Sequence, residues 1–136
     1  MSYNVLVNPG VNEDIAALAD EQTNVPKDWR LRDDEIQAAV EQAVKLIAAL
    51  RTDPYAGEQL QGRKNTRILD GCRRLKFDPR DPPPRGRPRM RLVWINEPDE
   101  ATIERVHVLS VTHRYDSRAY RRAAQRLGKA RRRDRD

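Results

Sequence analysis

This chain of 136 residues contains a single cysteine, no long apolar run and few aromatic side chains. Cys72 alone cannot form a disulfide within the chain and supports no metal site, so a reducing compartment is expected. No stretch approaches the length of a membrane span, and the N-terminal part lacks the basic and apolar regions of a secretory signal. We therefore expect a soluble, cytoplasmic protein without a membrane partner, a metal or a cofactor.

Charged residues make up 35% of the chain, and their distribution is uneven. Residues 1–62 carry 5 basic and 11 acidic side chains, residues 63–91 carry 11 and 3, and residues 114–136 carry 10 and 3. Such asymmetry indicates a surface for polyanions, whose phosphates attract cations regardless of sequence. A solubilising arginine-rich surface is the alternative, and charge alone does not decide between them.

The length suits one domain with a modest core. Residues 3–7 are rich in Val and Leu, which predicts a first strand, and the following Asn-Pro-Gly predicts a turn. A first helix is expected to begin at Asn12 as its N-cap and to end before Val25. The stretch 23–33 has no clear period, so Trp29 is predicted either to cover the core or to meet a partner.

The second predicted helix runs to about Arg51. Asp34 and Gln37 resemble a capping box, and five apolar side chains then share one helical face: Ile36, Val40, Val44, Ile47 and Leu50. Asp53-Pro54 ends this helix, because a residue before proline avoids helical angles.

Three strands are predicted in the second half. Residues 72–78 alternate, with Arg74 and Lys76 on one face. Residues 90–96 form the next strand, and a short acidic loop joins it to 106–111, so the two are expected to be antiparallel neighbours. The β-branched run 106–111 suits a strand buried on both faces.

Two segments are predicted to lie outside regular structure. Between Pro79 and Pro88 lie five of the nine prolines together with three arginines, so we expect residues 79–89 to form an extended, mobile loop without a core side chain. Residues 129–136 are too polar to bury anything and are expected to form a disordered basic tail.

The segment 105–127 is the most informative part of the chain. Its strand ends in His113 and Arg114, and a turn leads to a helix whose apolar positions recur at three- and four-residue spacing: Ala119, Tyr120, Ala123, Ala124 and Leu127. Arginines lie between these positions, so the helix should pack on one side and be cationic on the other.

A hydrophobic strand ending in Lys or His plus Arg, followed after five residues by Tyr and an Ala-rich helix, resembles the C-terminal half of the RelE/ParE superfamily of bacterial toxins. The resemblance covers roughly residues 54–128, and residues 1–128 are taken as the toxin domain. It implies an α+β fold related to microbial RNases. A small twisted antiparallel sheet of about four strands would carry two N-terminal helices on one face, with a short C-terminal helix beside it.

Cleavage of RNA without a metal needs a base for the 2′-hydroxyl, cations for the phosphorane and an acid for the leaving oxygen. Lys, Arg and Tyr can supply these groups when crowded cations lower a Lys or Tyr pKa. Arg74 and Lys76 project together from one strand, while Arg91 begins the next and Arg114 ends the last. Tyr120 could reach back to them from the helix.

The resemblance assigns roles to these positions. The basic-x-basic pair of the family matches Arg74 and Lys76, its third-strand Arg matches Arg91 in the sequence MRLVW, and its strand-end Arg and later Tyr match Arg114 and Tyr120. Catalysis is thus expected from Lys76, Arg91, Arg114 and Tyr120, and RNA or phosphate binding from Arg73, Arg74, Arg89, His113 and Arg118. Arg74 stands where Lys is usual, which favours phosphate binding over proton transfer.

Each of these residues also has a structural interpretation. Arg74 and Lys76 could form the solvent face of an edge strand. Tyr120 lies on the apolar stripe and could be a core tyrosine with a hydrogen-bonded hydroxyl. His113 could act in catalysis, because the ordinary pKa of histidine lies near neutrality, or it could be structural or stack on RNA.

The resemblance implies a type II toxin that cuts messenger RNA on the 70S ribosome and is neutralised by a cognate antitoxin, in a heterotetramer or a larger complex. Two other functions remain open. One is inhibition of gyrase, as in ParE-type toxins; the other is nucleic-acid binding without catalysis.

Overall fold

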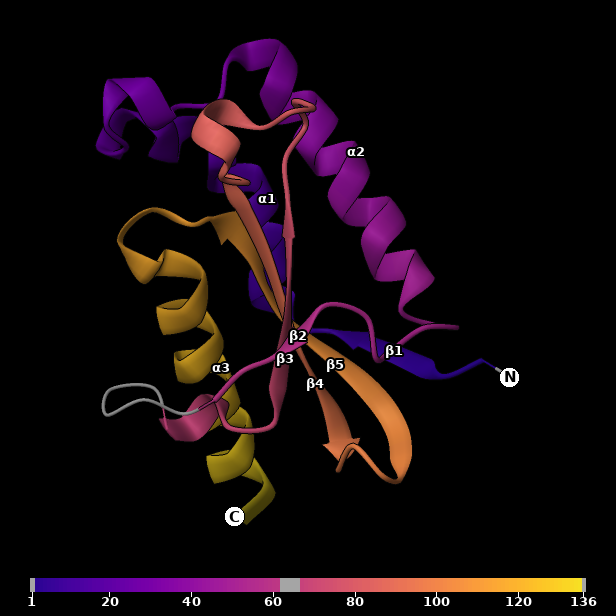
Figure 1. The fold of residues 1–136 in the computed structure, drawn as a ribbon. Coiled ribbons are helices and arrows are strands. Elements are labelled where there is room, and N and C mark those ends of the chain that lie inside the picture. Colours follow the sequence, from indigo (N-terminus) through magenta and orange to yellow (C-terminus); the bar gives the residue numbers. More distant parts are fainter. Residues whose placement is uncertain (1, 62–66, 136) are drawn as a thin grey trace.

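The computed structural model describes residues 2–61 and 67–135, which form a five-stranded mixed sheet with three helices (Figure 1). The strand order is β1 (Asn4–Val7), β5 (Ile103–His113), β4 (Met90–Pro98), β3 (Cys72–Phe77) and β2 (Glu58–Gln59). β1 is parallel to β5, and the other neighbours are antiparallel. The expected α+β architecture is confirmed, although the sheet has one more strand than expected and one parallel pair.

The central strands β4 and β5 are covered on both faces. All residues from Val106 to His113 are buried, as the β-branched run predicts. Val93 pairs with Ser110 and Trp94 with Val108, so Leu109 is an extra residue in β5. This bulge changes which side chains of β5 face each side of the sheet.

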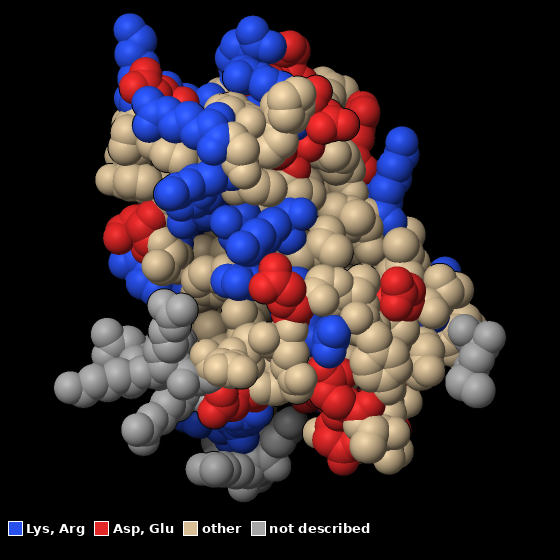
Figure 2. Space-filling model, viewed as in Figure 1, with Lys and Arg blue, Asp and Glu red and all other residues tan. Residues whose placement is uncertain are grey.

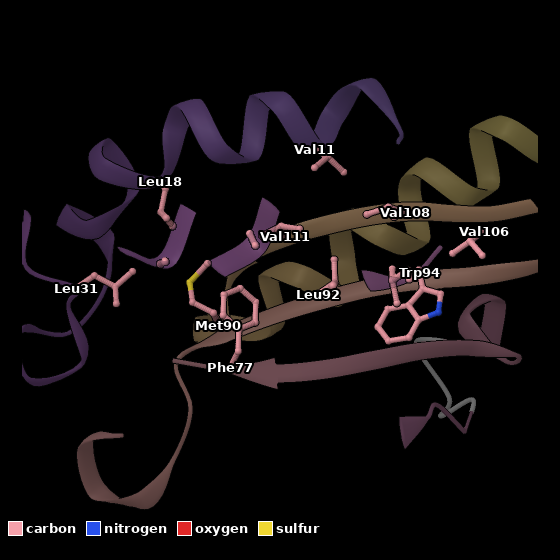
Figure 3. Packing of buried hydrophobic residues seen from close by; sticks show 13 residues of the cluster. Val11, Leu18, Leu31, Phe77, Met90, Leu92, Trp94, Val106, Val108 and Val111 are labelled. Atoms are coloured by element: carbon pink, nitrogen blue, oxygen red, sulfur yellow. The ribbon is translucent and has the colours of Figure 1, made fainter. Parts of the chain in front are cut away.

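The first face of the sheet packs against α1 (Pro9–Glu21) and α2 (Asp33–Ala49). Figure 3 shows Val11 and Leu18 of α1 directed toward Val108 and Val111 of the sheet. The buried side of α2 consists of Ala39 and Ala43 together with the partly buried Ile36, Val40 and Ile47. Val44, which was predicted to lie on the buried side, is 57% exposed, and Ala39 and Ala43 are buried in its place.

The opposite face packs against α3 (Arg118–Arg135), as Figure 1 shows. Its apolar positions contact side chains from β3, β4 and β5, in a cluster that includes Cys72, Val93, Leu109, Ala119, Ala123 and Leu127. The C-terminal helix therefore forms a second layer on the sheet. Among the described residues, no helix has the length and hydropathy needed to cross a membrane.

The helix ends differ from the predicted ones. Asn8 caps α1, because its Oδ1 accepts a hydrogen bond from the Gly10 N–H at 2.9 Å, and Asn12 lies inside the helix. At the start of α2, the Glu35 carboxylate accepts from the Arg32 N–H at 3.0 Å. The capping pair of α2 is therefore Arg32 and Glu35, and the predicted pair Asp34 and Gln37 lies within the helix.

The prediction of a disordered C-terminal tail was wrong, because α3 continues through residues 129–135. Ala, Arg and Lys have high helix propensity, so this polar segment can extend a helix that is already anchored. Gly128 allows the Ile68 side chain to lie close to the backbone of α3, because a Cβ at position 128 would lie 3.3 Å from Cδ1 of Ile68.

α3 is also bound to α1 by ion pairs. Asp14 is 1% exposed, and its carboxylate accepts hydrogen bonds from Arg122, from Arg126 and from the Val111 N–H. Glu21 pairs with Arg118 and Arg122. Part of the predicted cationic side of α3 is therefore neutralised by the acidic N-terminal helix.

A buried ion-pair network links α2 to the ends of β3 and β4. The Arg89 side chain is 1% exposed and donates to the Glu35 and Asp78 carboxylates at 2.8 Å each. Arg80 pairs with Glu35 at 3.0 Å. The segment 79–89 thus contributes a core side chain, contrary to the prediction.

These contacts lower the pKa of both carboxyl groups. Burial by itself would raise the pKa of Glu35, but hydrogen bonds from Arg89 and the Arg32 N–H and the charges of Arg89 and Arg80 lower it to about 2. The pKa of Asp78 is also lowered: burial opposes this shift, and hydrogen bonds from Arg89 and from backbone N–H groups outweigh it. Both groups are therefore carboxylates at neutral pH.

Replacing Arg89 by Met should lower the free energy of unfolding by about 3 to 5 kcal/mol, because Glu35 and Asp78 both lose their buried partner and Glu35 keeps only the more exposed Arg80 and Arg32. Urea unfolding followed by circular dichroism measures this loss. Arg85→Ala is the matched control, since Arg85 forms an exposed pair with Asp28, and it should cost less than about 0.5 kcal/mol. Equal effects of the two substitutions would contradict the importance of the network.

The network should also make stability acid-sensitive. The folded pKa of Glu35, about 2, lies below its ordinary value of 4.5, so this contribution is complete above pH 4.5 and is lost as the pH falls toward 2. Urea midpoints measured through this range should fall in the parent and fall less in Glu35→Gln, which keeps the contribution of Asp78. Parallel pH profiles for the two proteins would argue against Glu35 as a source of the acid sensitivity.

Candidate active site

Alternation along β3 directs Arg74 and Lys76 to the face of the sheet that carries α3. In the register, Arg74 lies opposite Val93 of the α3-side cluster, and Lys76 lies opposite Arg91. Arg91 in turn pairs with Thr112 of β5. Three cations therefore share one end of this face, and we call Arg74, Lys76, Arg91, Arg114 and Tyr120 the cationic cluster.

Tyr120 joins the cluster from the first turns of α3. Its hydroxyl accepts a hydrogen bond from Nη1 of Arg74 at 2.8 Å, and the Arg74 Cζ lies 6.0 Å from the centre of its ring. The ring is partly buried beside the α3-side core. The structural interpretation of Tyr120 is confirmed, because its ring packs beside the core and its hydroxyl is hydrogen-bonded, while its catalytic role stays a prediction.

Arg91 is held by the backbone that precedes it. Its Nη1 donates to the carbonyl oxygens of Pro88 and Met90 at 2.8 and 2.9 Å. Burial lowers the pKa of Arg91, as do the charges of Arg114 and Arg74, whereas the Tyr120 hydroxyl raises it. The guanidinium is thus confined among other cations, where an anionic ligand would relieve the repulsion.

Arg114 lies at the end of β5 and adjoins Trp29. Its N–H donates to the Arg89 carbonyl at 2.8 Å, and its Cζ lies 4.9 Å from the centre of the Trp29 ring. The attraction between a cation and the face of an aromatic ring holds the Arg114 guanidinium against Trp29, where in solution it would be surrounded by water. Trp29 is partly exposed and contacts the side chain of a predicted site residue, so its contact with a partner stays a prediction, while Leu31 is buried in the core.

Glu58 belongs to the site although the sequence analysis did not identify it. Its carboxylate lies 3.2 Å from Nη2 of Arg74 and 4.0 Å from Nζ of Lys76. The hydrogen bond and charge of Arg74 and the charge of Lys76 lower the pKa of Glu58. The register of β2 against β3 places it there, and the only sequence signal is an acid in a loop that leads to basic residues.

Arg89 and Arg73 were predicted to bind phosphate, and neither is free to do so. Arg89 is enclosed in the network with Glu35 and Asp78. Arg73 points to the other side of β3, where it donates to the Tyr55 and Ala56 carbonyls and pairs with Glu100 at 2.9 Å. Alternation along a strand separates Arg73 from Arg74.

His113 and Arg118 are also engaged elsewhere. His113 is 1% exposed; its Nε2 donates to the Trp29 carbonyl and its Nδ1 accepts from the Tyr115 N–H. Burial lowers the pKa of His113 to about 4, so the ring is neutral at pH 7. Arg118 pairs with Glu21 of α1 at 3.0 Å. These contacts do not agree with the prediction that the two side chains bind RNA.

The cationic cluster can stabilise a phosphate that gains negative charge. Its arginines offer fixed guanidinium donors, and Lys76 and Tyr120 add groups that can exchange a proton. Figure 2 shows Lys and Arg side chains gathered across this face, with Asp and Glu side chains between them. Within residues 2–61 and 67–135, no three His, Cys, Asp or Glu side chains are grouped as a metal site.

The fold is also found in a solved structure, that of the E. coli toxin RelE, which was determined in the free state with two arginines replaced by alanine. The sequence identity is 18% and the TM-score is 0.52, and the match covers 93% of this chain and 98% of that chain. This likeness establishes that the chain has the RelE-like fold. Neither a protein-family model nor a curated protein sequence matches the chain.

Glu58→Gln should bind single-stranded RNA several-fold more tightly than the parent, because Arg74 and Lys76 lose a carboxylate that competes with phosphate. Fluorescence anisotropy with a labelled, non-cleavable 2′-O-methyl RNA measures the change. Glu41→Gln removes the same charge from the exposed side of α2 and should have a much smaller effect. Weaker binding by Glu58→Gln would instead mean that Glu58 orders the cations for the ligand.

Proposed function

We propose that this protein is a toxin-type endoribonuclease that cuts messenger RNA on the ribosome without a metal. The observation that carries the proposal is the cationic cluster: Arg74 and Tyr120, 46 positions apart in the sequence, meet beside Lys76, Arg91 and Arg114. The RelE-like fold supports the proposal, as does the resemblance of these positions to the residue pattern of the family.

In the proposed reaction, the RNA 2′-hydroxyl attacks the adjacent phosphorus and the 5′-oxygen leaves. Arg74, Arg91 and Arg114 bind the non-bridging oxygens, whose negative charge increases in the phosphorane. Lys76 and Tyr120 are the members of the cluster that can accept or donate a proton, because an arginine hardly deprotonates. The base and the acid are therefore assigned to these two residues as a pair.

The ribosome and an antitoxin are the proposed partners. The antitoxin should present acidic and apolar side chains to the surface of Arg74, Lys76 and Arg91, since an uncovered nuclease would damage its host. Association through this surface should weaken with salt, because it replaces counterions on a concentrated positive charge. A heterotetramer or a larger complex would result, and the cytoplasm is the proposed location.

The deciding experiment measures cleavage of messenger RNA bound in the ribosomal A site, mapped by primer extension. Arg114→Ala should slow cleavage by about 10² to 10³, because it removes a charge-assisted contact made mostly in the transition state. Tyr120→Phe should also cut poorly, although the ring and its packing remain. Ribosome binding should change only several-fold in both, since other arginines still contact phosphate.

Two matched variants control for charge and for a tyrosine hydroxyl. Arg105→Ala removes a guanidinium paired with Glu97 at the far end of β5, and Tyr55→Phe removes a hydroxyl bonded to the Glu100 carbonyl. Both should cleave like the parent. Full activity of Arg114→Ala and Tyr120→Phe would show that the active site lies elsewhere. A parent that leaves messenger RNA intact but inhibits gyrase would favour a ParE-like activity.

A further inference from the structure

A pocket of about 360 Å³ lies at the end of β5, beside the cationic cluster. One wall comes from Pro26 and Trp29, which precede α2, and the other from residues 114–117, which lead into α3. Arg114 belongs to both the pocket and the cluster. An RNA chain that places a phosphate among the clustered cations would therefore bring a neighbouring nucleotide to this pocket.

Aromatic rings and a guanidinium plane contribute to the lining of the pocket. The Trp29 ring carries the stacked Arg114 guanidinium, and Tyr115 is 38% exposed. His113 also lines the pocket, with a neutral ring whose two nitrogens are already hydrogen-bonded to the Trp29 carbonyl and the Tyr115 N–H. Aromatic rings and guanidinium planes are the surfaces on which unpaired bases stack.

The one carboxylate of the pocket does not oppose a polyanion. Asp116 pairs with Arg121 of α3 at 2.8 Å, so its charge is locally compensated. The backbone here is unusual, because Asp116 and Ser117 have φ angles of 57° and 54° although neither is glycine. Consecutive residues in this region are strained, and such strain is concentrated at ligand sites. It turns the chain sharply between Tyr115 and α3.

From this arrangement we infer that the pocket is a nucleotide subsite, which receives one base of single-stranded RNA next to the phosphate held by the cationic cluster. The base stacks on Tyr115 and on the Arg114–Trp29 pair. This inference rests on the proposed action on RNA and adds to it a site for one base. The subsite would give position-dependent recognition, which the cations alone cannot provide because every phosphate is alike.

The test uses 2′-O-methyl RNA hexamers in which each position in turn is abasic. These probes carry the same charge, so differences in affinity report the bases. One position should dominate, with affinity falling about tenfold when its base is missing. Intrinsic fluorescence gives a second readout: of the two tryptophans Trp94 is fully buried, so a base-dependent change reports Trp29.

Variants separate stacking from charge. Tyr115→Ala should bring the intact and abasic probes to equal affinity while leaving the salt dependence unchanged. Arg85→Ala is the control, since Arg85 lies 5.3 Å from the Trp29 ring without lining the pocket, and it should keep the tenfold difference. Circular dichroism and thermal unfolding establish that each variant is folded.

The outcomes distinguish this inference from the proposed nuclease activity. If ribosome-bound messenger RNA is cut but no hexamer position dominates, the subsite is wrong and the nuclease stands. If one position dominates and Tyr115→Ala abolishes the preference, the subsite stands even when cleavage is absent. Failure of the parent to bind any hexamer at low salt would overturn the subsite. A preference that persists unchanged in Tyr115→Ala would place the base elsewhere.

Discussion

The buried pairing of Arg89 with Glu35 and Asp78 is the interaction on which the arrangement of the site depends. It joins α2 to the end of β3 and the start of β4, and the backbone around it serves the site directly. The Arg89 carbonyl accepts from the Arg114 N–H, and the carbonyls on either side of Arg89 accept from the Arg91 guanidinium. A structural arginine thus positions two of the arginines proposed for catalysis.

A second buried carboxylate has the same role for the C-terminal helix. Asp14 receives hydrogen bonds from Arg122 and Arg126 of α3 and from the backbone of β5. These bonds hold α3 against the sheet in the register that brings the Tyr120 hydroxyl to Arg74. The acidic N-terminal helix therefore neutralises arginines that have structural roles, whereas Arg74, Arg91 and Arg114 lie together in the cluster, with Arg91 only 7% exposed.

The cluster concentrates positive charge on a small area, and two features moderate it. Glu58 occupies part of the region where a phosphate would bind, and Trp29 supports the Arg114 guanidinium from the other side. Both come from segments outside the strands that carry the cations. Competition by a carboxylate favours ligands with more negative charge, and the aromatic wall favours ligands with a planar base. Single-stranded RNA has both properties.

The sequence by itself determined the periodic features: the strands near 72–78, 90–96 and 106–111, the two N-terminal helices, and the placing of Arg74 and Lys76 on one face. These follow from local alternation and helical spacing, which need no knowledge of neighbours. The tertiary structure decided which arginines come together at one end of the sheet. Arg73, Arg89 and Arg118 resemble the arginines of the cluster in the sequence, but carboxylates or carbonyl groups of other elements engage them. Glu58 and Trp29 belong to the site through contacts with Arg74 and Arg114. Such contacts between distant segments leave no periodic signal in the sequence.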